Sequence, residues 1–484
     1  MIFLGIDLGT SAIKLLAIDP EQKTIATHTV PLTVTHAHSG WSEQTPSDWI
    51  DALETGLDAL KLEIGSAMSD IKGIGLSGQM HGATLLDKTG KVLRPCILWN
   101  DTRSHVEAAA LDADPQFRRI TGNIVFPGFT APKLVWLQKH EPEVFGQIAQ
   151  VLLPKDYLRL YLTGEYASEM SDASGTAWLD TGARQWSEQL LGACDLTINQ
   201  VPKLIEGTEA SGRLKQQHAD RWGMQRDVAV AGGAGDNAAS AIGLGTVTEG
   251  SGFLSLGTSG VLFAATEAFR PAPETAVHSF CHTLPDTWHQ MGVVLSAASA
   301  LGWWSNICGV APAALIADLG TDLNPPGSVT FLPYLAGERT PHNDPGMTAS
   351  FSGLTTATSR AELTQAVLEG VAFTFRENRD ALSAAGTQID QLIATGGGAR
   401  SQYWLKLLAS VLDIPVWLPT QGDLGAALGA ARLGMIASGS ASVTQACIAP
   451  RIAHAFQADR NLQAPLMQAY ETFVGDRKAL LRGC

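Results

Sequence analysis

The chain has 484 residues, of which 45% are hydrophobic and 17% are charged, and its formal net charge is −14 at pH 7. This length predicts two or more domains, and the composition is typical of a globular protein with large apolar cores. An acidic balance without long runs of one sign argues against nucleic acid or an anionic membrane surface as the main partner.

The N-terminal stretch "MIFLGIDLGT" lacks the basic start of a signal peptide, and no apolar run reaches the roughly 20 residues that a membrane span needs. The cysteines are scattered without a CxxC pair, which favours a reduced, cytoplasmic setting over a disulfide framework or a zinc site. They are Cys96, Cys194, Cys281, Cys308, Cys447 and Cys484.

The first predicted element is a β-hairpin, "IFLGIDLGTSAIKLLAID" (2–19), which turns around residues 9–11. The stretch "SGFLSLGTSGVLFAAT" (251–266) repeats this plan around residues 257–259. The shared "LGTS" starts at residues 8 and 256, an offset of 256 − 8 = 248, close to half the chain length. We therefore predict two similar α/β lobes whose turns face the space between them, although an ordinary tight turn used twice would give the same letters.

These turns are suited to phosphate because successive N–H groups and hydroxyls can surround an anion. The candidate phosphate-binding residues are Thr10 and Ser11 in the first turn, and Gly257 and Thr258 in the second. Neither GxxxxGK[ST] nor GxGxxG occurs at either hairpin, which argues against a P-loop or a Rossmann site.

A loop with the sequence "GQMHGAT" follows the predicted strand "IKGIGLS" and carries Met80 and His81 between two glycines. A lone histidine in a loop is more often a surface residue than a ligand. Further on, "WNDTR" contains Asp101 and Arg103, which either line a cleft or form an ion pair that orders the loop.

The stretch "AVAGGAGDNAASA" (229–241) places three glycines directly before a single acid, Asp236. Glycine permits a close approach of the backbone to a ligand, so the loop suits an acid that acts as a general base. The alternative is that Asp236 caps the helix that starts at Asn237. Asp7 is the other singular acid, because it lies within an apolar strand where burial without a partner is unfavourable.

A third glycine cluster lies in "IDQLIATGGGARSQYWLKLLASVL" (389–412), which predicts a strand, a glycine turn and an amphipathic helix. Such a turn admits a flat group such as adenine, or serves only to pack a helix closely on a strand. Trp303 in "SALGWWSN" is a candidate to flank that group, or a core residue.

Three of these motifs together resemble the phosphate and adenosine motifs of the actin/hexokinase/Hsp70 ATPase superfamily: "GIDLGTS", "LSLGTSG" and "TGGGARSQYW". Two longer stretches, "FTAPKLVWLQKHEPE" (129–143) and "FSGLTTATSRAELTQAVLEGVAF" (351–373), resemble the signature segments of the FGGY carbohydrate kinases. The stretches "SGQMHGATLLD", "LWNDTR", "LPKDYLRLYLTGEYASEMSDASGT" and "GERTPHND" are most similar to the bacterial xylulokinase branch of that family. The resemblance extends in order over the whole chain.

The resemblance implies an α/β fold of two ribonuclease-H-like, actin-like lobes, each with a mixed five-stranded sheet and flanking helices, around a central cleft. It divides the chain into an N-terminal lobe (1–242), a C-terminal lobe (243–440) and a C-terminal helical segment (441–484). It also implies a cytoplasmic enzyme that transfers phosphate from ATP to D-xylulose with the help of Mg²⁺. The sequence leaves the oligomeric state open, with a homodimer as one option.

The resemblance assigns roles to individual residues. Asp236 is expected to be the general base and Asp7 to organise magnesium, mainly through water, as Mg²⁺ commonly does. His81 is expected to donate to sugar hydroxyls and Met80 to cover an apolar face of the sugar. The expected sets are Met80, His81, Asp236 and Asn237 for the sugar, and Thr10, Ser11, Gly257, Thr258, Gly397, Gly398 and Ser401 for ATP.

Two departures and two alternatives accompany this interpretation. Met80 and His81 stand where relatives with glycerol-type pockets carry an Arg-Glu pair, which argues against glycerol as substrate. Ser401 stands where some relatives carry asparagine, which weakens one contact to adenosine. The alternatives are a kinase of another sugar or polyol, such as ribulose, gluconate or a deoxyketose, and a non-catalytic actin-like nucleotide switch.

Overall fold

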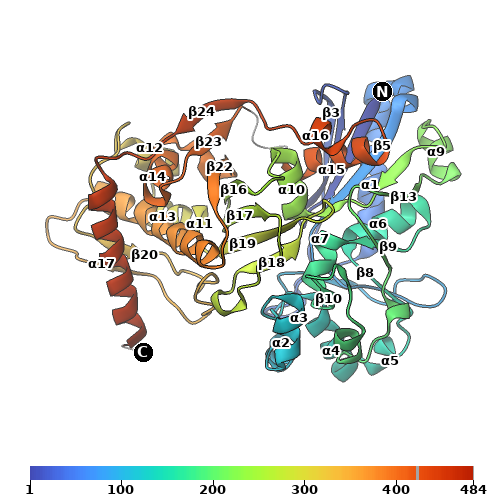
Figure 1. The fold of residues 1–484 in the computed structure, drawn as a ribbon, viewed down its shortest axis with the longest axis horizontal. Helices are drawn as coiled ribbons and strands as arrows, with labels where there is room; N and C mark the ends of the chain where they lie inside the picture. The colour runs from blue at the N-terminus through green and yellow to red at the C-terminus, as the bar shows by residue number, and fades with distance from the viewer. Residues whose placement is uncertain (421–424, 483–484) are drawn as a thin grey trace.

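The computed structural model describes residues 1–420 and 425–482, which form two lobes side by side (Figure 1). Each lobe is built on one seven-stranded sheet that mixes parallel and antiparallel pairs. Helices pack against these sheets, so that the α/β fold with two similar lobes is confirmed.

The first sheet has the order β13-β14-β5-β1-β2-β3, and β15 pairs with β5 beyond the end of β14. β1 runs antiparallel to β2 and parallel to β5, which is in turn parallel to β14. The strands are β1 (Ile2–Leu8), β2 (Ala12–Ile18), β3 (Thr24–Pro31), β5 (Ile71–Gly78), β13 (Ala210–Arg213), β14 (Ala229–Ala231) and β15 (Ala234–Gly235).

The second sheet, of order β18-β19-β17-β16-β22-β23-β24, repeats this plan. β16 is antiparallel to β17 and parallel to β22, which is parallel to β23. The strands are β16 (Gly250–Leu256), β17 (Gly260–Thr266), β18 (His278–Cys281), β19 (Trp288–Val294), β22 (Ile389–Thr395), β23 (Val416–Pro419) and β24 (Ile452–Phe456). β16 begins 250 − 2 = 248 residues after β1, the offset of the repeated motif.

The sheets are wider than predicted. The five expected strands lie in equivalent order in both lobes, β3-β2-β1-β5-β14 and β19-β17-β16-β22-β23. Short strands then extend each sheet: β13 and β15 in the first, β18 and β24 in the second. β24 comes from the segment 441–484, which therefore contributes a strand as well as helices α16 (Val443–Ala446) and α17 (Gln463–Arg482).

Between β5 and β13 the first lobe carries a long insertion of short elements. Its helices are α2 (His105–Asp112), α3 (Pro115–Thr121), α4 (Thr130–His140), α5 (Pro142–Phe145), α6 (Pro154–Thr163), α7 (Met170–Ala173) and α8 (Glu188–Gly192). Its short strands are β6 (Thr84–Leu86), β7 (Cys96–Ile97), β8 (Gln150–Leu152), β9 (Ala167–Glu169), β10 (Leu179–Asp180), β11 (Gln185–Trp186) and β12 (Lys203–Ile205). They form two-stranded sheets, in one of which β7 pairs with β4 (Glu43–Gln44), a strand that precedes β5.

The longer helices begin at recognisable signals. α1 (Pro46–Ile64) starts with proline, which is favourable at a first helical position. α13 (Arg360–Ala384) starts with a capping box, in which Ser359 and Glu362 each bond the backbone N–H of the other. Shorter helices outside the insertion are α9 (Gln216–Trp222), α11 (Ala298–Cys308), α12 (Pro312–Ala317) and α14 (Gln402–Leu412). A short antiparallel pair is formed by β20 (Thr330–Leu332) and β21 (Ser350–Ser352).

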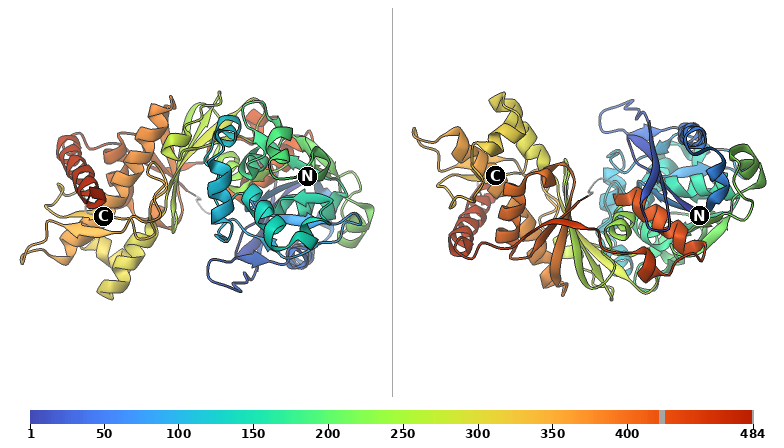
Figure 2. Two further views of the ribbon diagram at one scale, coloured as in Figure 1. Left: turned by 90° about the horizontal axis from the view of Figure 1, so that it is seen from below. Right: turned by 90° about the horizontal axis from the view of Figure 1, so that it is seen from above.

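Two helices join the lobes: α10 (Asp236–Leu244) and α15 (Gly425–Ala437), which pack on each other. α15 lies between β23 and β24 of the second sheet in sequence but packs on β1 and β5 of the first, as the right-hand view of Figure 2 shows. The approach is very close, because a Cβ atom on Gly75 would lie 1.7 Å from the carbonyl oxygen of Ala430. A helix from the range 243–440 therefore completes the packing of the first lobe.

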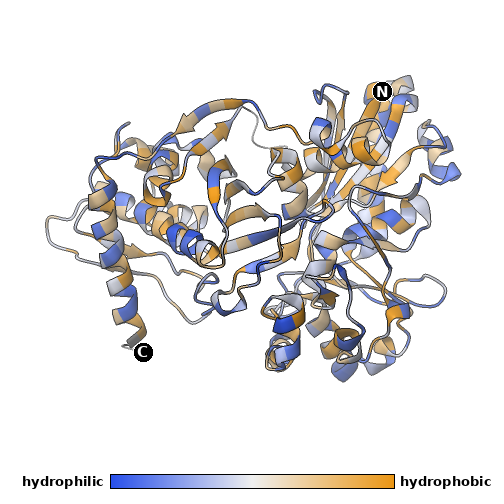
Figure 3. Cartoon of the chain, in the orientation of Figure 1, coloured by the Kyte–Doolittle hydropathy of each residue, from blue (hydrophilic) through white to orange (hydrophobic). Residues whose placement is uncertain are grey.

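The interior strands of both sheets are largely apolar, as Figure 3 shows, and each sheet lies in a large buried cluster. Among residues 1–420 and 425–482, no helix has the length and apolarity required to cross a membrane. The five cysteines within these ranges are free thiols.

Candidate active site

Three strands of the first sheet end side by side and bring two acids together. The register pairs Asp7 of β1 with Ser77 of β5, and Ser77 with Ala234 of β15. Asp236 follows two residues after Ala234, as the first residue of α10. The acids therefore meet at the carboxyl edge of parallel strands, where α/β folds bind their ligands.

The two carboxylates influence each other. Burial raises the pKa of Asp7, while the hydroxyl of Ser77 and the charge of Lys14 act in the opposite direction. Burial, and next the charge of Asp7, raise the pKa of Asp236 to about 6. A carboxylate with this pKa can accept a proton near neutral pH more effectively than an ordinary aspartate.

The side chain of Asp236 does not cap the helix. Gly235 is the N-cap residue of α10, and no side chain caps it there. Oδ1 of Asp236 accepts hydrogen bonds from the backbone N–H of Asn237 at 2.7 Å and from its Nδ2 at 3.0 Å. Oδ2 has no hydrogen-bond partner in the described ranges, so the alternative of a capping aspartate is not supported. Asn237 thus fixes the carboxylate and leaves one oxygen for a ligand.

The glycines before Asp236 fit a loop that is held from several sides. Gly233 has a φ of 80°, in the left-handed region, and a Cβ atom on Gly232 would lie 2.3 Å from a backbone oxygen. Arg159 donates to the carbonyl oxygen of Gly232, and the N–H of Gly235 donates to Oγ of Ser171 at 3.1 Å. These contacts fix the backbone that presents the acid.

Behind this loop lies a fully buried charge cluster, formed by Lys155, Asp156, Arg159, Glu169 and Asp172. Nζ of Lys155 lies 3.0 Å from Asp156, 3.2 Å from Glu169 and 2.8 Å from Asp172. Burial raises the pKa of Asp172 to about 8 despite the lysine. This cluster was not predicted from the sequence, although charged residues within the apolar "LPKDYLRLYLTGE" were a visible signal.

The predicted sugar loop lies beside the same edge. Met80 is 6% exposed and packs under the glycine loop, because a Cβ atom on Gly235 would lie 3.0 Å from its sulfur. It therefore forms a wall of the site rather than an exposed cover. His81 has a φ of 69°, and its Nδ1 lies 2.7 Å from the carbonyl oxygen of Gly175.

The protonation of His81 corrects one expectation. A carbonyl oxygen only accepts, so Nδ1 carries the proton in the bond to Gly175. Burial, and next the charge of Lys133, lower the pKa of His81 to about 3, so the ring is neutral at pH 7. Its Nε2 is consequently able to accept a hydrogen bond but not to donate one, whereas the expectation from the sequence was a ring that donates to sugar hydroxyls.

The first hairpin turn is anchored through Thr10. Its hydroxyl donates to Oε1 of Gln79 at 3.0 Å and accepts from Nε1 of Trp99 at 2.9 Å. Ser11 is exposed at the tip of the turn. Thr10 is thus already bonded within the protein, while the side chain of Ser11 is exposed.

The second turn is attached to the start of α11. The carbonyl oxygen of Gly257 accepts from the N–H of Ala298 at 2.9 Å, and that of Thr258 accepts from Ala297 at 3.1 Å. The side chain of Thr258 is exposed. This turn therefore presents a hydroxyl on a backbone that α11 holds rigid.

The third glycine cluster borders a cavity of about 490 Å³. Gly397, Gly398 and Ser401 line it together with apolar residues of α11, α12 and α14. The hydroxyl oxygen of Ser401 also accepts the N–H of Trp404 at 3.1 Å, which caps α14. A cavity with one apolar wall and one glycine wall can take a flat group such as a purine.

Three further candidates, Trp303, Asp101 and Arg103, have structural roles. Trp303 stacks on Phe331, with ring centroids 5.8 Å apart, and does not line the 490 Å³ cavity. Asp101 and Arg103 form a buried ion pair with an N–O distance of 2.7 Å, and the guanidinium lies 3.5 Å above the ring of Trp41. The pair orders its loop, which is the second of the two roles considered.

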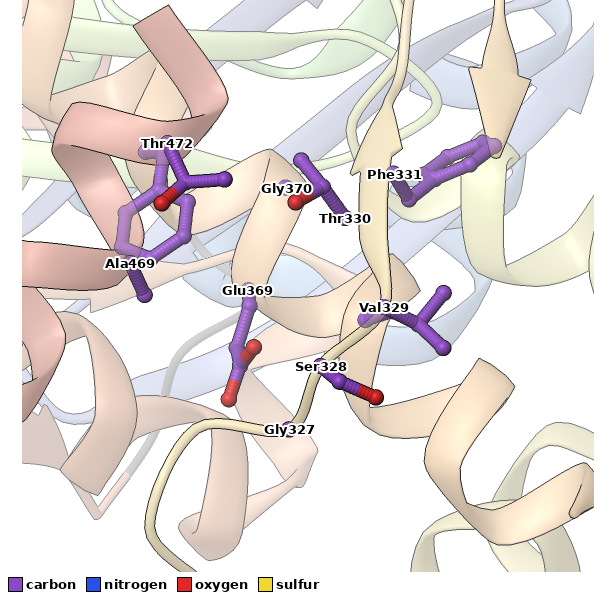
Figure 4. Close-up of a pocket in the computed structure, with 11 residues that line it drawn as sticks. Gly327, Ser328, Val329, Thr330, Phe331, Glu369, Gly370, Ala469 and Thr472 are labelled. Carbon is purple, nitrogen blue, oxygen red and sulfur yellow. The ribbon is translucent and has the colours of Figure 1, made fainter. Parts of the chain in front are cut away.

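A smaller cavity of about 120 Å³ lies between α13, β20 and α17 (Figure 4). Glu369 lines this cavity, and its Oε1 accepts a hydrogen bond from Nε2 of Gln365 at 2.8 Å. Burial raises the pKa of Glu369 to about 7. None of the predicted site residues lines this cavity, so it is not part of the candidate active site.

Comparisons with known proteins agree with this geometry. The model of the N-terminal domain of the FGGY family of carbohydrate kinases matches residues 2–243, and that of the C-terminal domain matches residues 252–438. The chain is 50% identical over 439 residues to a xylulose kinase of Escherichia coli K12, covering 90% of both chains.

Two solved structures have the same fold along the whole chain. A protein of Brucella ovis described as a xyloylose kinase has a TM-score of 0.99 at 57% identity, with both chains fully covered. The xylulose kinase of Rhodospirillum rubrum has a TM-score of 0.94 at 28% identity, covering 100% of this chain and 99% of that one.

Proposed function

The chain belongs to the FGGY family of carbohydrate kinases, and from this membership we propose that it phosphorylates D-xylulose with ATP to give D-xylulose 5-phosphate. The relatives that are 50% and 57% identical to it over nearly the whole chain are described as xylulose and xyloylose kinases, which supports this sugar over others. The observation that carries the proposal is Asp236, an acid of raised pKa with a free oxygen, held between Asp7 and the His81 loop.

In this proposal Asp236 is the general base. Its carboxylate takes the proton of the sugar hydroxyl while the hydroxyl oxygen forms a bond to the γ-phosphorus and ADP leaves with the electrons of the broken P–O bond. Asn237 keeps the carboxylate oriented, and Nε2 of His81 accepts a second sugar hydroxyl. Met80 closes the wall behind them.

The nucleotide would bind across the lobes. Residues Thr10, Ser11, Gly257 and Thr258 are the proposed phosphate contacts, and the 490 Å³ cavity beside Gly397, Gly398 and Ser401 is the proposed adenosine site. Because Thr10 is bonded to Gln79, its contribution is mainly through the backbone of its turn.

The paired acids also fit a magnesium ion. Asp7 and Asp236 both have raised pKa values, and a bound cation would compensate the charge that they place in the site. Asp7 is the residue that we propose to hold it, and Mg²⁺ would neutralise charge on the phosphate oxygens during transfer. Among the described residues no group of three metal-binding side chains occurs, which agrees with an ion held mostly by phosphates and water.

A coupled assay of ADP release with a panel of sugars tests the substrate directly. We expect kcat/KM to be highest for D-xylulose, and well below it for ribulose, gluconate, deoxyketoses and glycerol. Higher efficiency with another sugar would reassign the substrate, whereas ATP hydrolysis that no sugar accelerates would favour the nucleotide switch. A cytoplasmic location is part of the proposal.

Substitution of His81 should affect sugar binding selectively. In His81→Ala we expect KM for D-xylulose to rise about 2- to 12-fold, the equivalent of one lost hydrogen bond, with KM for ATP unchanged. Steady-state kinetics with each substrate varied in turn measures this. An equal rise in both KM values would mean that the loop only supports the fold.

The raised pKa of Asp236 predicts a pH profile. A base must be ionised to act, so kcat/KM for the sugar should fall as the pH drops through about 6, approaching tenfold per pH unit below it. An aspartate of ordinary pKa would keep the profile flat to pH 5. A profile without this limb would argue against Asp236 as the base.

A further inference from the structure

His81 has a backbone conformation that needs support. Its φ of 69° lies in the left-handed region, which residues with a Cβ atom seldom adopt unless their surroundings impose it. The conformation turns the ring toward Gly175, where Nδ1 is anchored. What holds the backbone of His81 therefore also determines where its free Nε2 points.

The first turn of α4 supplies this support. Nζ of Lys133 donates to the carbonyl oxygen of His81 at 2.8 Å, and Oγ1 of Thr130 donates to the same oxygen at 3.1 Å. The ring of Phe129, the N-cap residue of α4, stacks on the His81 ring with centroids 4.8 Å apart. Three residues at the start of α4 thus contact His81, two at its backbone carbonyl and one at its ring.

Lys133 is unusual among the buried cations. It is fully buried, forms no ion pair with any carboxylate in the described ranges, and donates otherwise only to the carbonyl oxygen of Gly128 at 2.8 Å. Burial lowers its pKa to about 7. A buried ammonium without a counter-ion opposes folding, so a contribution to stability does not explain its presence there.

We propose that Lys133 is a positioning residue for the sugar: together with Thr130 it holds the carbonyl of His81 and thereby aims Nε2 of the ring at a substrate hydroxyl. The inference rests on the proposed sugar-binding role of His81. It assigns a task to "FTAPKL", the start of the first of the two segments that resemble the family signatures.

The variant Lys133→Met tests this because methionine has a similar length and no donor. We expect KM for D-xylulose to rise about three- to tenfold, as for the loss of one hydrogen bond, with KM for ATP within about twofold of the wild type. The melting temperature should be unchanged or higher, since a buried charge has been removed. A lower melting temperature with unchanged KM values would overturn the proposal in favour of a structural role.

The matched control is Leu137→Ala, one turn further along α4 at a fully buried position. It should lower the melting temperature through its cavity while leaving KM for the sugar close to the wild-type value. If it raised that KM as much as Lys133→Met does, loosening of α4 would explain both results. At the second donor, Thr130→Val should give a smaller rise and Thr130→Ser should restore the wild-type value.

Two measurements separate this inference from the proposed function. In the double variant His81→Ala, Lys133→Met, KM for the sugar should equal that of His81→Ala alone, because Lys133 acts through His81. Independently of any substrate, the NMR signal of the His81 ring should shift in Lys133→Met but stay in place in Leu137→Ala. An unshifted signal would overturn the inference, whereas a shifted signal in an enzyme indifferent to D-xylulose would reject only the proposed substrate.

Discussion

The variant Asp236→Asn should lose turnover by about 10²–10⁴-fold while it still binds sugar and ATP. Asparagine keeps the size of the side chain and its bonds to Asn237, but it cannot take the proton of the hydroxyl. Because burial and Asp7 disfavour the charge of Asp236, its removal should leave the melting temperature unchanged or raise it. Turnover, ligand titrations and thermal unfolding measure the three quantities.

The matched control is Asp48→Asn, the same change at an exposed position in the first turn of α1. It should leave turnover near the wild-type value. Turnover in Asp236→Asn at close to the normal rate would show that this acid is not the base, whatever its effect on stability.

The variant Lys155→Met should destabilise the first lobe by about 3–5 kcal/mol, the usual effect of breaking a buried ion cluster. Three carboxylates lose a cation within 3.2 Å, and Oδ1 of Asp172 already has no hydrogen-bond partner in the described part of the chain. Because the cluster also holds the loop before Asp236, turnover should fall with stability. Chemical denaturation at pH 8 measures the change, with Lys203→Met at an exposed site as control.

The loss of folding stability in Lys155→Met should increase as the pH rises. Asp172 has a folded-state pKa above its unfolded value, so its protonation favours the folded state, and this stability is lost as the pH rises toward about 8. Removal of Lys155 raises that pKa further, and Lys155→Met should therefore be least stable, relative to the wild type, at alkaline pH. Adding Asp172→Asn should restore part of the stability, and a failure to do so would place the effect elsewhere.

Local sequence patterns were sufficient to predict the two lobes, and they singled out Asp7 and Asp236 as candidate site residues. Both hairpins carry a glycine turn between apolar strands, and in each lobe the two strands that flank the turn pair directly with each other. The pairing of Asp7 with Ser77 could not be predicted in this way, because the order of the strands depends on the whole sheet and not on a local pattern. The sequence analysis had Asp7 in a strand and Asp236 on a distant loop, and the effect of Asp7 on the pKa of Asp236 depends on the sheet that brings them together.

The features that escaped prediction depend on distant contacts. The acceptor role of His81 depends on Gly175, 94 residues away, and its left-handed backbone on α4. The packing of α15 on the first sheet is easier to recognise in the sequence. Gly73 and Gly75 alternate within an apolar strand, and small residues recur along "GAALGAARLG" in α15. Glycine inside a strand often marks the close approach of another backbone.

The position of α15 also has a consequence for synthesis on the ribosome. The strands of the first sheet are complete by residue 243, but α15 ends at residue 437, which is 437 − 243 = 194 residues later. At about 5–20 residues per second this is a delay of about 10–40 s, during which the glycine face of β1 and β5 has no cover. The nascent first half therefore stays open to aggregation and chaperone binding until the second half is nearly made, and the two halves mature as one unit.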